Sequence, residues 1–260
     1  PTAGAIRFRA GDGPLVDVAP LDRRALAPYR QHMQMIFQDP FSSLNPRMMV
    51  GDIIGEPLLV NRVGDAASRR ARVRELLDLV QLPAAYQNRF PHAFSGGQRQ
   101  RIGIARALAL NPSLVVADEP VSALDVSVQA QIVNLLLELR QRLAISYLFV
   151  HDLSVVKHMS DRVVVMYVGR IVEEAPTRAL FDTPRHPYTE ALLSAVPKPD
   201  PRRRSQRIVL GGEVADPAHP PPGCAFHPRC RYAVERCMVD TPVLAALGNG
   251  RRVACHRASE

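Results

Sequence analysis

Lysine is nearly absent from the 260 residues, and tryptophan is absent altogether. The two lysines, Lys157 and Lys198, follow Val156 and Pro197, so neither completes the Gly-x-x-x-x-Gly-Lys-Ser/Thr pattern of a phosphate-binding P-loop. No apolar run approaches the ~18 residues that a membrane-spanning helix needs, and residues 1–10 contain no apolar signal-peptide core. These absences predict a cytosolic chain that contains neither a membrane span nor a P-loop.

The composition is that of a globular protein with an excess of positive charge. Hydrophobic residues make up 47% and charged residues 22% of the chain, which excludes wholesale disorder. The formal net charge is +8, but the basic residues are scattered arginines, apart from the run 202–204. Aromatic residues make up only 5%, too few for a surface that stacks bases, so we expect no nucleic-acid partner.

Strand-like and helix-like segments alternate along the first three quarters of the chain, which predicts an α/β fold with a partly parallel sheet. We expect a helix that is N-capped by Asp125, and a hairpin over 162–174 that turns near Val168 and Gly169. The other predicted helices span 68–80 and 98–110, and the predicted strands are 5–8, 33–38, 114–117 and 145–150.

A change of composition divides the chain near residue 197. Residues 197–222 hold seven of the 23 prolines, a density typical of an extended linker, and all four cysteines follow it. We therefore expect one domain over 1–196, a linker over 197–222, and a small cysteine-bearing region over 223–260.

Two short segments carry residues suited to phosphate chemistry. Ser95, Gly96, Gly97 and Gln98 stand at the start of a predicted helix, where free backbone amides and the helix dipole favour an anion. Asp118 and Glu119 end a predicted strand, where one carboxylate can hold Mg²⁺ and the other can deprotonate a water molecule. Alone, each segment also fits a plain helix cap or a solvated turn.

The order of five elements gives these segments a common meaning. Gln38, the Ser95–Gln98 segment, Asp118 with Glu119, Asp125 and His151 follow one another as they do in the ATP-binding subunits of ABC transporters, which this chain resembles over nearly all of 1–196. The resemblance implies a P-loop NTPase-type ABC ATPase domain with a helical subdomain at about 40–110. It also implies ATP and Mg²⁺ as ligands.

The same resemblance assigns roles to individual residues. It makes Glu119 the catalytic base and His151 the switch histidine that contacts the γ-phosphate. Asp118 and Gln38 then lie at the Mg²⁺. The resemblance makes Ser95–Gln98 the signature motif, which acts on nucleotide held by a second ATP-binding subunit, and it places Asp125 in the D-loop.

Residues 37–47 and 54–58, His186-Pro187-Tyr188-Thr189 and the cysteine region are similar to the oligopeptide/dipeptide importer branch. This branch implies permease partners, an extracytoplasmic binding protein and a peripheral place at the cytoplasmic face of the inner membrane. Nickel and glutathione are alternative substrates. A soluble ABC ATPase of DNA repair or translation is the alternative class, but the long coiled-coil insertion or tandem cassette usual there is absent.

The resemblance also implies a P-loop and an adenine-stacking aromatic residue, which these 260 residues lack. We therefore expect that about fifty residues or more of the domain precede Pro1 in complete members. We also expect that this chain alone neither binds ATP tightly nor hydrolyses it. A degenerate partner of an intact second subunit, or a gene remnant, remains an alternative.

The cysteines Cys224, Cys230, Cys237 and Cys255 have the spacing C-x5-C-x6-C-x17-C. A cytosolic setting argues against disulfides, and zinc sites usually have shorter Cys pairs. Four thiolates can hold an iron–sulfur cluster, and some members of the resembled branch carry a 4Fe-4S cluster in this region. A cluster, a zinc ion and bare thiols all remain open.

Overall fold

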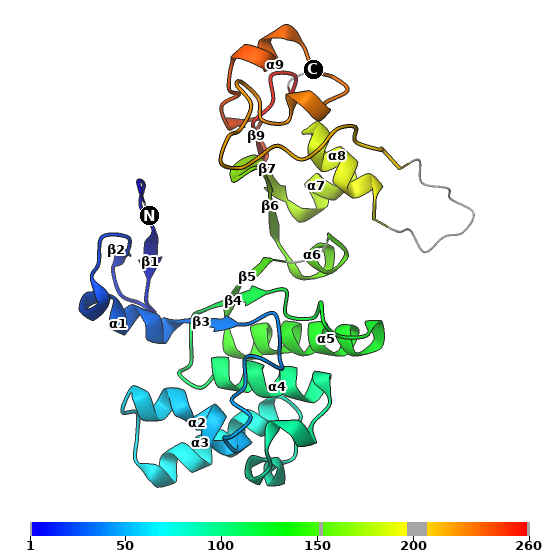
Figure 1. Ribbon diagram of the computed structural model, residues 1–260. Helices are drawn as coiled ribbons and strands as arrows, with labels where there is room; N and C mark the ends of the chain where they lie inside the picture. Colours follow the sequence, from blue (N-terminus) through cyan, green and yellow to red (C-terminus); the bar gives the residue numbers. More distant parts are fainter. Residues whose placement is uncertain (1, 151–152, 197–206, 259–260) are drawn as a thin grey trace. The chain divides into compact units, whose positions relative to one another are not determined.

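The computed structural model of the chain describes residues 2–150, 153–196 and 207–258 (Figure 1). Its contacts divide the chain into two units, Pro1–His151 and Asp152–Glu260. The first unit contains, in order, β1 (Arg7–Arg9), β2 (Leu15–Asp17), α1 (Arg23–His32), β3 (Met33–Ile36), α2 (Val50–Val60), α3 (Ala66–Leu79), η1 (Ala84–Asn88), η2 (Pro91–Ala93), α4 (Gly96–Ala107), β4 (Leu114–Asp118), α5 (Val126–Leu143) and β5 (Ser146–Val150). The second contains α6 (Leu153–Met159), β6 (Arg162–Tyr167), β7 (Arg170–Pro176), α7 (Thr177–Asp182), α8 (Pro187–Ser194), η3 (His227–Arg229), α9 (Glu235–Val239), β8 (Ala245–Ala246) and β9 (Arg252–Val253).

Three parallel strands form the sheet that positions the polar residues of the first unit. β4 lies between β3 and β5, and Ala117 of β4 is in register with Ile36 and Phe149. The apolar run of β4 predicts a buried strand, and Val115 and Ala117 are fully buried. Because all three strands run the same way, their carboxyl ends meet at one edge of the sheet, where α/β proteins bind ligands.

The helices α2, α3 and α4 form a helical subdomain below this sheet in Figure 1, with α4 between the α2–α3 pair and α5. The apolar residues recur at helical spacing, so that Ile54, Leu77, Ile102 and Ile104 are all buried in its core. Because α4 also packs against β3, the helix that begins at Gly96 is tied to both the subdomain and the sheet.

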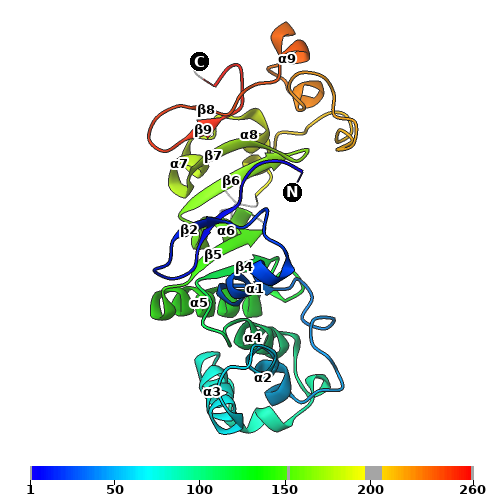
Figure 2. The same ribbon diagram turned by 90° about the vertical axis from the view of Figure 1, so that its left-hand side faces the viewer.

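The second unit is built on the hairpin of β6 and β7. Val168 and Gly169 turn the chain with φ angles of 46° and 71°, which suit a two-residue hairpin loop. β9 pairs with β7 and with β8, which completes a four-stranded antiparallel sheet. Figure 2 shows α7 and α8 beside this sheet, and Phe226 lies in the core between them.

The α/β class and the predicted strands and helices are confirmed, with shifts of one to three residues at their ends. The strand expected at 5–8 is β1, Arg7–Arg9, which pairs with β2. The predicted domain boundaries at 196 and 222 stay a prediction, since residues 197–206 lie outside the described part of the chain. β9 adds to the sheet of β7, so the cysteine-bearing segment shares one unit with residues 153–196.

Among the helices of the described residues, none is both long enough and apolar enough to cross a membrane.

Candidate functional site

The carboxyl edge of the parallel sheet brings together two of the predicted site residues. Gln38 follows β3 and Glu119 follows β4, and the side-chain Nε2 of Gln38 donates a 2.6 Å hydrogen bond to Oε2 of Glu119. β3 and β4 are parallel neighbours, so the residues that follow them meet at the same edge of the sheet. The bond holds the Glu119 carboxylate in one orientation while its other oxygen stays available to a ligand.

Glu119 has an unusual backbone conformation. Its φ angle is 43°, in the left-handed region that non-glycine residues rarely adopt. The Glu119 N–H donates to the carbonyl of Val150 at the end of β5, and Ser122 donates both its N–H and its hydroxyl to the Glu119 carbonyl. These three bonds fix the turn, so the strained backbone aims the carboxylate from a rigid position.

Asp118 is the last residue of β4 and is half-buried. Within the described residues, its carboxylate has no hydrogen-bond partner in the fold. Mg²⁺ prefers hard oxygen ligands, and the Gln38 side chain, whose Nε2 bonds Glu119, also carries an amide oxygen. Asp118 and Gln38 thus each carry oxygen of the kind that Mg²⁺ prefers, and their joint role as its ligands stays a prediction.

Ser95 caps α4 through a reciprocal pair of hydrogen bonds. Its hydroxyl accepts the N–H of Gln98 at 3.4 Å, and the Gln98 side chain accepts the N–H of Ser95 at 3.1 Å. Such a box satisfies one donor inside the helix and one before it. The amides of Gly96 and Gly97 are among the first of the helix, where no carbonyl lies one turn back to accept them. The segment therefore offers backbone donors to an anion.

The two glycines of this segment pack against the start of α5. A Cβ atom on Gly97 would lie 2.5 Å from Cγ1 of Val128, and one on Gly96 would lie 3.3 Å from Cδ2 of Leu124. Only glycine allows the first of these approaches. The start of α4 is thereby pressed against the loop and helix that carry Asp125.

Asp125 caps α5 as the sequence predicts. Its carboxylate accepts the hydroxyl of Ser127 at 2.7 Å and the N–H of Val128 at 3.0 Å. The Ser127 hydroxyl and then the Val128 amide hold the pKa of Asp125 below its usual value of 3.8. Its described contacts are those of a helix cap, and a D-loop role stays a prediction.

Sequence reasoning missed the side chains that fasten the segment after Gln38 to α4. The guanidinium of Arg99 lies over the ring of Phe41, with its carbon 4.2 Å from the ring centroid. Arg106 donates from Nη1 to the carbonyl of Ser43 at 2.6 Å. Arg99 and Arg106 stand seven residues apart, or two helical turns, a signal that could have marked one face of α4 as a contact surface.

The described hydrogen bonds join Gln38 to Glu119 and Ser95 to Gln98, but none within residues 2–150 joins one pair to the other. His151, the predicted γ-phosphate contact, lies outside the described residues.

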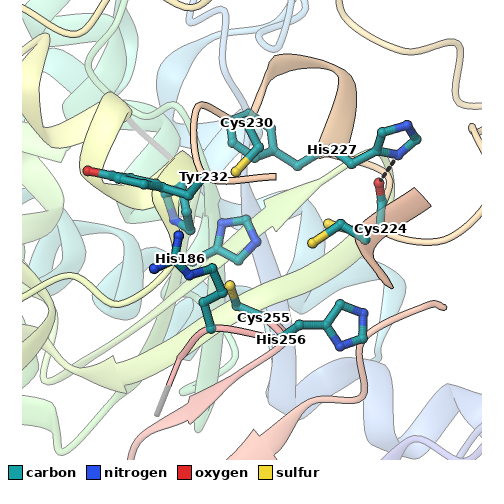
Figure 3. Close-up of a pocket in the computed structure, with 11 residues that line it drawn as sticks. His186, Cys224, His227, Cys230, Tyr232, Cys255 and His256 are labelled. Atoms are coloured by element: carbon teal, nitrogen blue, oxygen red, sulfur yellow. Dashed lines mark hydrogen bonds between the residues drawn. The ribbon is translucent and has the colours of Figure 1, made fainter. Parts of the chain in front are cut away.

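The four cysteines of the second unit line a single cavity (Figure 3). They are not joined in disulfides, and the space open to water between them is about 20 Å³, the size of one water site. The walls between the cysteines also contain His186, Phe226, His227, Tyr232, His256 and Arg257. Burial raises the pKa of the Cys224 and Cys230 thiols, and the neighbouring cysteines raise it further.

The cavity does not resemble a site for one metal ion. Over the described residues, no group of three or more His, Cys, Asp or Glu side chains is placed to hold a single ion. This observation gives no support to a zinc ion or to an iron–sulfur cluster in this cavity.

A buried carboxylate anchors one wall of this cavity. Glu173 of β7 is fully buried and accepts the N–H of Arg185 at 3.0 Å and the N–H of His186 at 2.9 Å. Arg251 lies 3.5 Å from Glu173 and donates to the carbonyls of Thr183 and Ala179 at the end of α7. The pair fixes residues 179–186 to the strands on either side, and nothing in the sequence pattern signals it.

Family comparisons cover both units of the chain. A family model described as "ABC transporter" matches residues 1–122, and one described as "Oligopeptide/dipeptide transporter, C-terminal region" matches residues 172–237.

Among similar curated proteins, a peptide import ATP-binding protein of Brucella ovis is 53% identical over 99% of this chain and 80% of its own length. The dipeptide transport ATP-binding protein DppF of Haemophilus influenzae is 51% identical over 90% of this chain and 72% of its own. The di/tripeptide transport protein DppF of Pseudomonas aeruginosa is 47% identical over the whole chain and 79% of its own.

Two solved structures share the fold. The ATP-binding cassette MJ0796, a dimer bound to ADP and phosphate, has a TM-score of 0.54 and 30% identity over 63% of this chain and 71% of its own. The protein cbiO1 of Clostridium perfringens, part of the ABC transporter complex cbiONQ, has a TM-score of 0.58 and 26% identity over 67% of this chain and 70% of its own.

Proposed function

Because the chain belongs to the ATP-binding subunits of ABC transporters, in their oligopeptide/dipeptide import branch, we propose that it takes part in coupling ATP hydrolysis to the uptake of short peptides. The observation that best supports this role is the hydrogen bond between Gln38 and Glu119 at the carboxyl edge of the parallel sheet. The partners in this proposal are membrane permeases, a second ATP-binding subunit and, indirectly, an extracytoplasmic binding protein. The subunit would lie at the cytoplasmic face of the inner membrane.

The chemistry of this proposal divides among the residues at that edge. Glu119 takes a proton from the water that attacks the γ-phosphate, since its carboxylate is held by a rigid turn. Asp118 and Gln38 offer oxygen ligands to the Mg²⁺, which neutralises charge on the phosphates when bound. Ser95, Gly96, Gly97 and Gln98 present amides to nucleotide on the second subunit, and Asp125 and His151 complete the set by family likeness.

The role of Glu119 can be tested in a transporter whose ATP-binding subunit carries these residues together with a P-loop. We expect Glu119→Gln to lower ATP turnover by about 10²- to 10⁴-fold, the usual contribution of a positioned base, and to leave the nucleotide-bound dimer trapped. Glu138→Gln, an equal change on the exposed side of α5, is the control. Unchanged turnover in the Glu119 variant would reject the assignment.

We propose further that the 260 residues by themselves neither bind MgATP tightly nor hydrolyse it. They contain no P-loop lysine, and the P-loop supplies most of the contacts to the β- and γ-phosphates. Titration calorimetry of the 260-residue chain with MgATP should then give no micromolar binding. A micromolar affinity would overturn this proposal without touching the role of Glu119.

A peptide importer and a soluble ABC ATPase are expected to co-purify with different partners. The likeness of residues 172–237 to the oligopeptide/dipeptide transporter C-terminal region supports the importer. Purification from membranes should recover permeases with the chain, whereas recovery of nucleic acid would favour the soluble alternative. Peptides, nickel and glutathione can be compared as cargo in the same preparation, by uptake of each labelled compound.

We also propose that Cys224, Cys230, Cys237 and Cys255 hold a 4Fe-4S cluster. The thiol donors suit iron–sulfur chemistry, and they surround one cavity. A cluster is larger than the one water that the cavity admits, so the segments that carry the thiols must move outward on loading. When bound, such a group can accept and return one electron.

Iron and sulfide analysis of the chain, purified without oxygen, tests the cluster. We expect about four irons and four sulfides per chain and a brown protein, the stoichiometry of the proposed 4Fe-4S cluster. Cys237→Ser should lower the iron content, while Arg252→Met, a change outside the cavity, should not. A folded, colourless chain without iron would reject the cluster and leave four reduced thiols.

A further inference from the structure

The second unit has a larger groove beside the cysteine cavity. The groove offers a volume of about 340 Å³, which is within the range of small-molecule sites. It is lined by residues 184–187, Glu190, Tyr232, Cys255 and residues 257–258. His186, Tyr232 and Cys255, which Figure 3 labels, line both the groove and the cysteine cavity. All the lining residues belong to the second unit, so the groove is a feature of that unit alone.

Arg185 brings a positive charge to the groove that no carboxylate neutralises. The buried Glu173 accepts the backbone N–H of Arg185 at 3.0 Å and has its own cation, Arg251, at 3.5 Å. The side chain of Arg185 is exposed, and over the described residues no ion pair includes its guanidinium. Glu173 thus anchors the backbone at Arg185 and leaves the charge of its side chain to the groove.

Glu190, the acidic residue of the groove wall, already has a cation as its partner. Its Oε1 lies 2.8 Å from Nη2 of Arg231. The guanidinium carbon of Arg231 also lies 4.7 Å from the centroid of the Tyr232 ring, and that of Arg257 lies 5.8 Å from the same centroid. Both distances allow an attraction between the cation and the ring. The wall therefore keeps Arg257 at the groove, and the charge of Glu190 is balanced by Arg231.

His186 adds no charge to this balance at neutral pH. It is almost completely buried, and burial lowers its pKa to about 4. The ionised groups of the groove are therefore Arg185, Arg257 and the pair of Glu190 with Arg231, which leaves an excess of positive charge. Concave walls that carry charge of one sign concentrate ions of the opposite sign. The groove therefore favours an anion.

We propose that this groove binds a small organic anion through a terminal carboxylate or phosphate group, with Arg185 and Arg257 as the cationic donors. A guanidinium presents its N–H groups as a planar fork that matches the paired oxygens of both acidic groups. The groove is larger than an inorganic ion requires, so it also holds the organic part of the molecule. This inference goes beyond the proposed function and rests neither on ATP hydrolysis nor on an iron–sulfur cluster.

The experiment is titration calorimetry of the full 260-residue chain with two pairs of probes. N-acetyl-alanylalanine and glucose 6-phosphate carry an acidic group, whereas N-acetyl-alanylalanine amide and glucose lack it. We expect an acidic probe to bind with a dissociation constant of about 1 mM, as suits a small ligand in an open groove. The neutral probes should not bind. If only one acidic probe binds, its acidic group is the one that the groove takes. Binding of neither acidic probe, or equal binding of acidic and neutral probes, would overturn the proposal.

Arg185→Met removes the unneutralised charge and keeps the backbone N–H that Glu173 accepts. We expect the dissociation constant of the acidic probe to rise about tenfold, the usual effect of losing a hydrogen bond to a charged group. Arg170→Met is the matched control, because it removes the same charge from an exposed position of the same unit outside the groove. Its affinity should equal that of the unchanged chain. Equal weakening in the two variants would reveal a general effect of charge and would overturn the proposal.

Glu190→Gln tests the charge balance with a change of opposite sign. It removes the carboxylate that neutralises Arg231, so the groove becomes more positive. We expect the acidic probe to bind about two- to threefold more tightly, the scale of an exposed charge pair. If Glu190 served only to hold the wall in place, its loss would weaken binding instead. A lower affinity in Glu190→Gln would therefore overturn the proposal, even where Arg185→Met does not fold.

Discussion

The two units hold their polar residues in opposite ways. In the first unit, Gln38 is exposed and Asp118 and Glu119 are half-buried, at the open edge of a sheet. In the second, Glu173 and His186 are buried, and the four cysteines line one small cavity. The open edge is suited to a ligand and a partner that arrive and leave, whereas the cavity is suited to a group that stays.

This difference predicts how each unit responds to mutation. Residues at the open edge contribute little to the core, so their loss should remove chemistry and leave the fold. Residues around the cavity hold neighbouring segments together, so their loss should weaken the fold as well. The following three changes test that contrast.

The largest effect is expected from Arg251→Met, which leaves the buried Glu173 without its cation. Removing one partner of a buried ion pair typically costs about 3–5 kcal/mol. Arg252→Met is the control, because Arg252 is half-exposed and its pair with Glu174 should contribute no more than about 1 kcal/mol. Chemical denaturation of both variants, together with hydrogen exchange of β7 and α8, measures the loss of stability. Equal losses in the two variants would contradict the role of the buried pair.

A smaller loss of stability is expected from Gly97→Ala. Gly97 is a predicted site residue of the first unit that also packs closely against Val128. The new Cβ would overlap Val128, and overpacking of this kind typically costs about 1–3 kcal/mol. Gly103→Ala, in the same helix with no neighbour within 4 Å, should instead stabilise the chain by up to about 1 kcal/mol. Such a loss would be an exception to the contrast between the units, since Gly97 belongs to the predicted site and also contributes to the stability of the fold.

The double variant Gly97→Ala with Val128→Ala sharpens this test. If the overlap is the cause, the second change should restore part of the loss, so that the two effects do not add. Simple additivity in thermal unfolding would place the cause elsewhere.

The smallest effect is expected at Asp125 and depends on pH. Its pKa is lowered in the folded chain, so its stabilising contribution is complete above about pH 4 and is lost as the pH falls through the folded value. Asp125→Asn keeps the cap without the titration. The melting temperature of the unchanged chain should therefore fall more between pH 6 and pH 3 than that of the variant, as followed by circular dichroism, and parallel decreases would contradict it.

Much of the first unit could be predicted from the sequence because its signals are local. The apolar run at 114–117 marks a buried strand, and Ser95 and Asp125 cap their helices where expected. By contrast, α1 was missed, since it contains Pro28 and buries none of its residues.

The remaining features arise from packing between residues far apart in the chain. The left-handed backbone of Glu119 depends on bonds to Val150 and Ser122. Nothing in the sequence around Gly97 or around Val128 indicates that the two residues are in contact. The cavity is lined by His186 and by cysteines as far along the chain as Cys255. A strand of two residues such as β9 is too short to show a hydrophobic periodicity in the sequence.

The pairing of β7 with β9 also has a consequence for synthesis on the ribosome. Glu173 emerges first, and its register partner Val253 follows ~80 residues later, which takes roughly 4–16 s at ~5–20 residues per second. During that interval Glu173 lacks Arg251, and one edge of β7 has no neighbouring strand. Until residue 253 is available, the nascent second unit therefore carries an unpaired strand edge, the kind of edge at which chains misassociate.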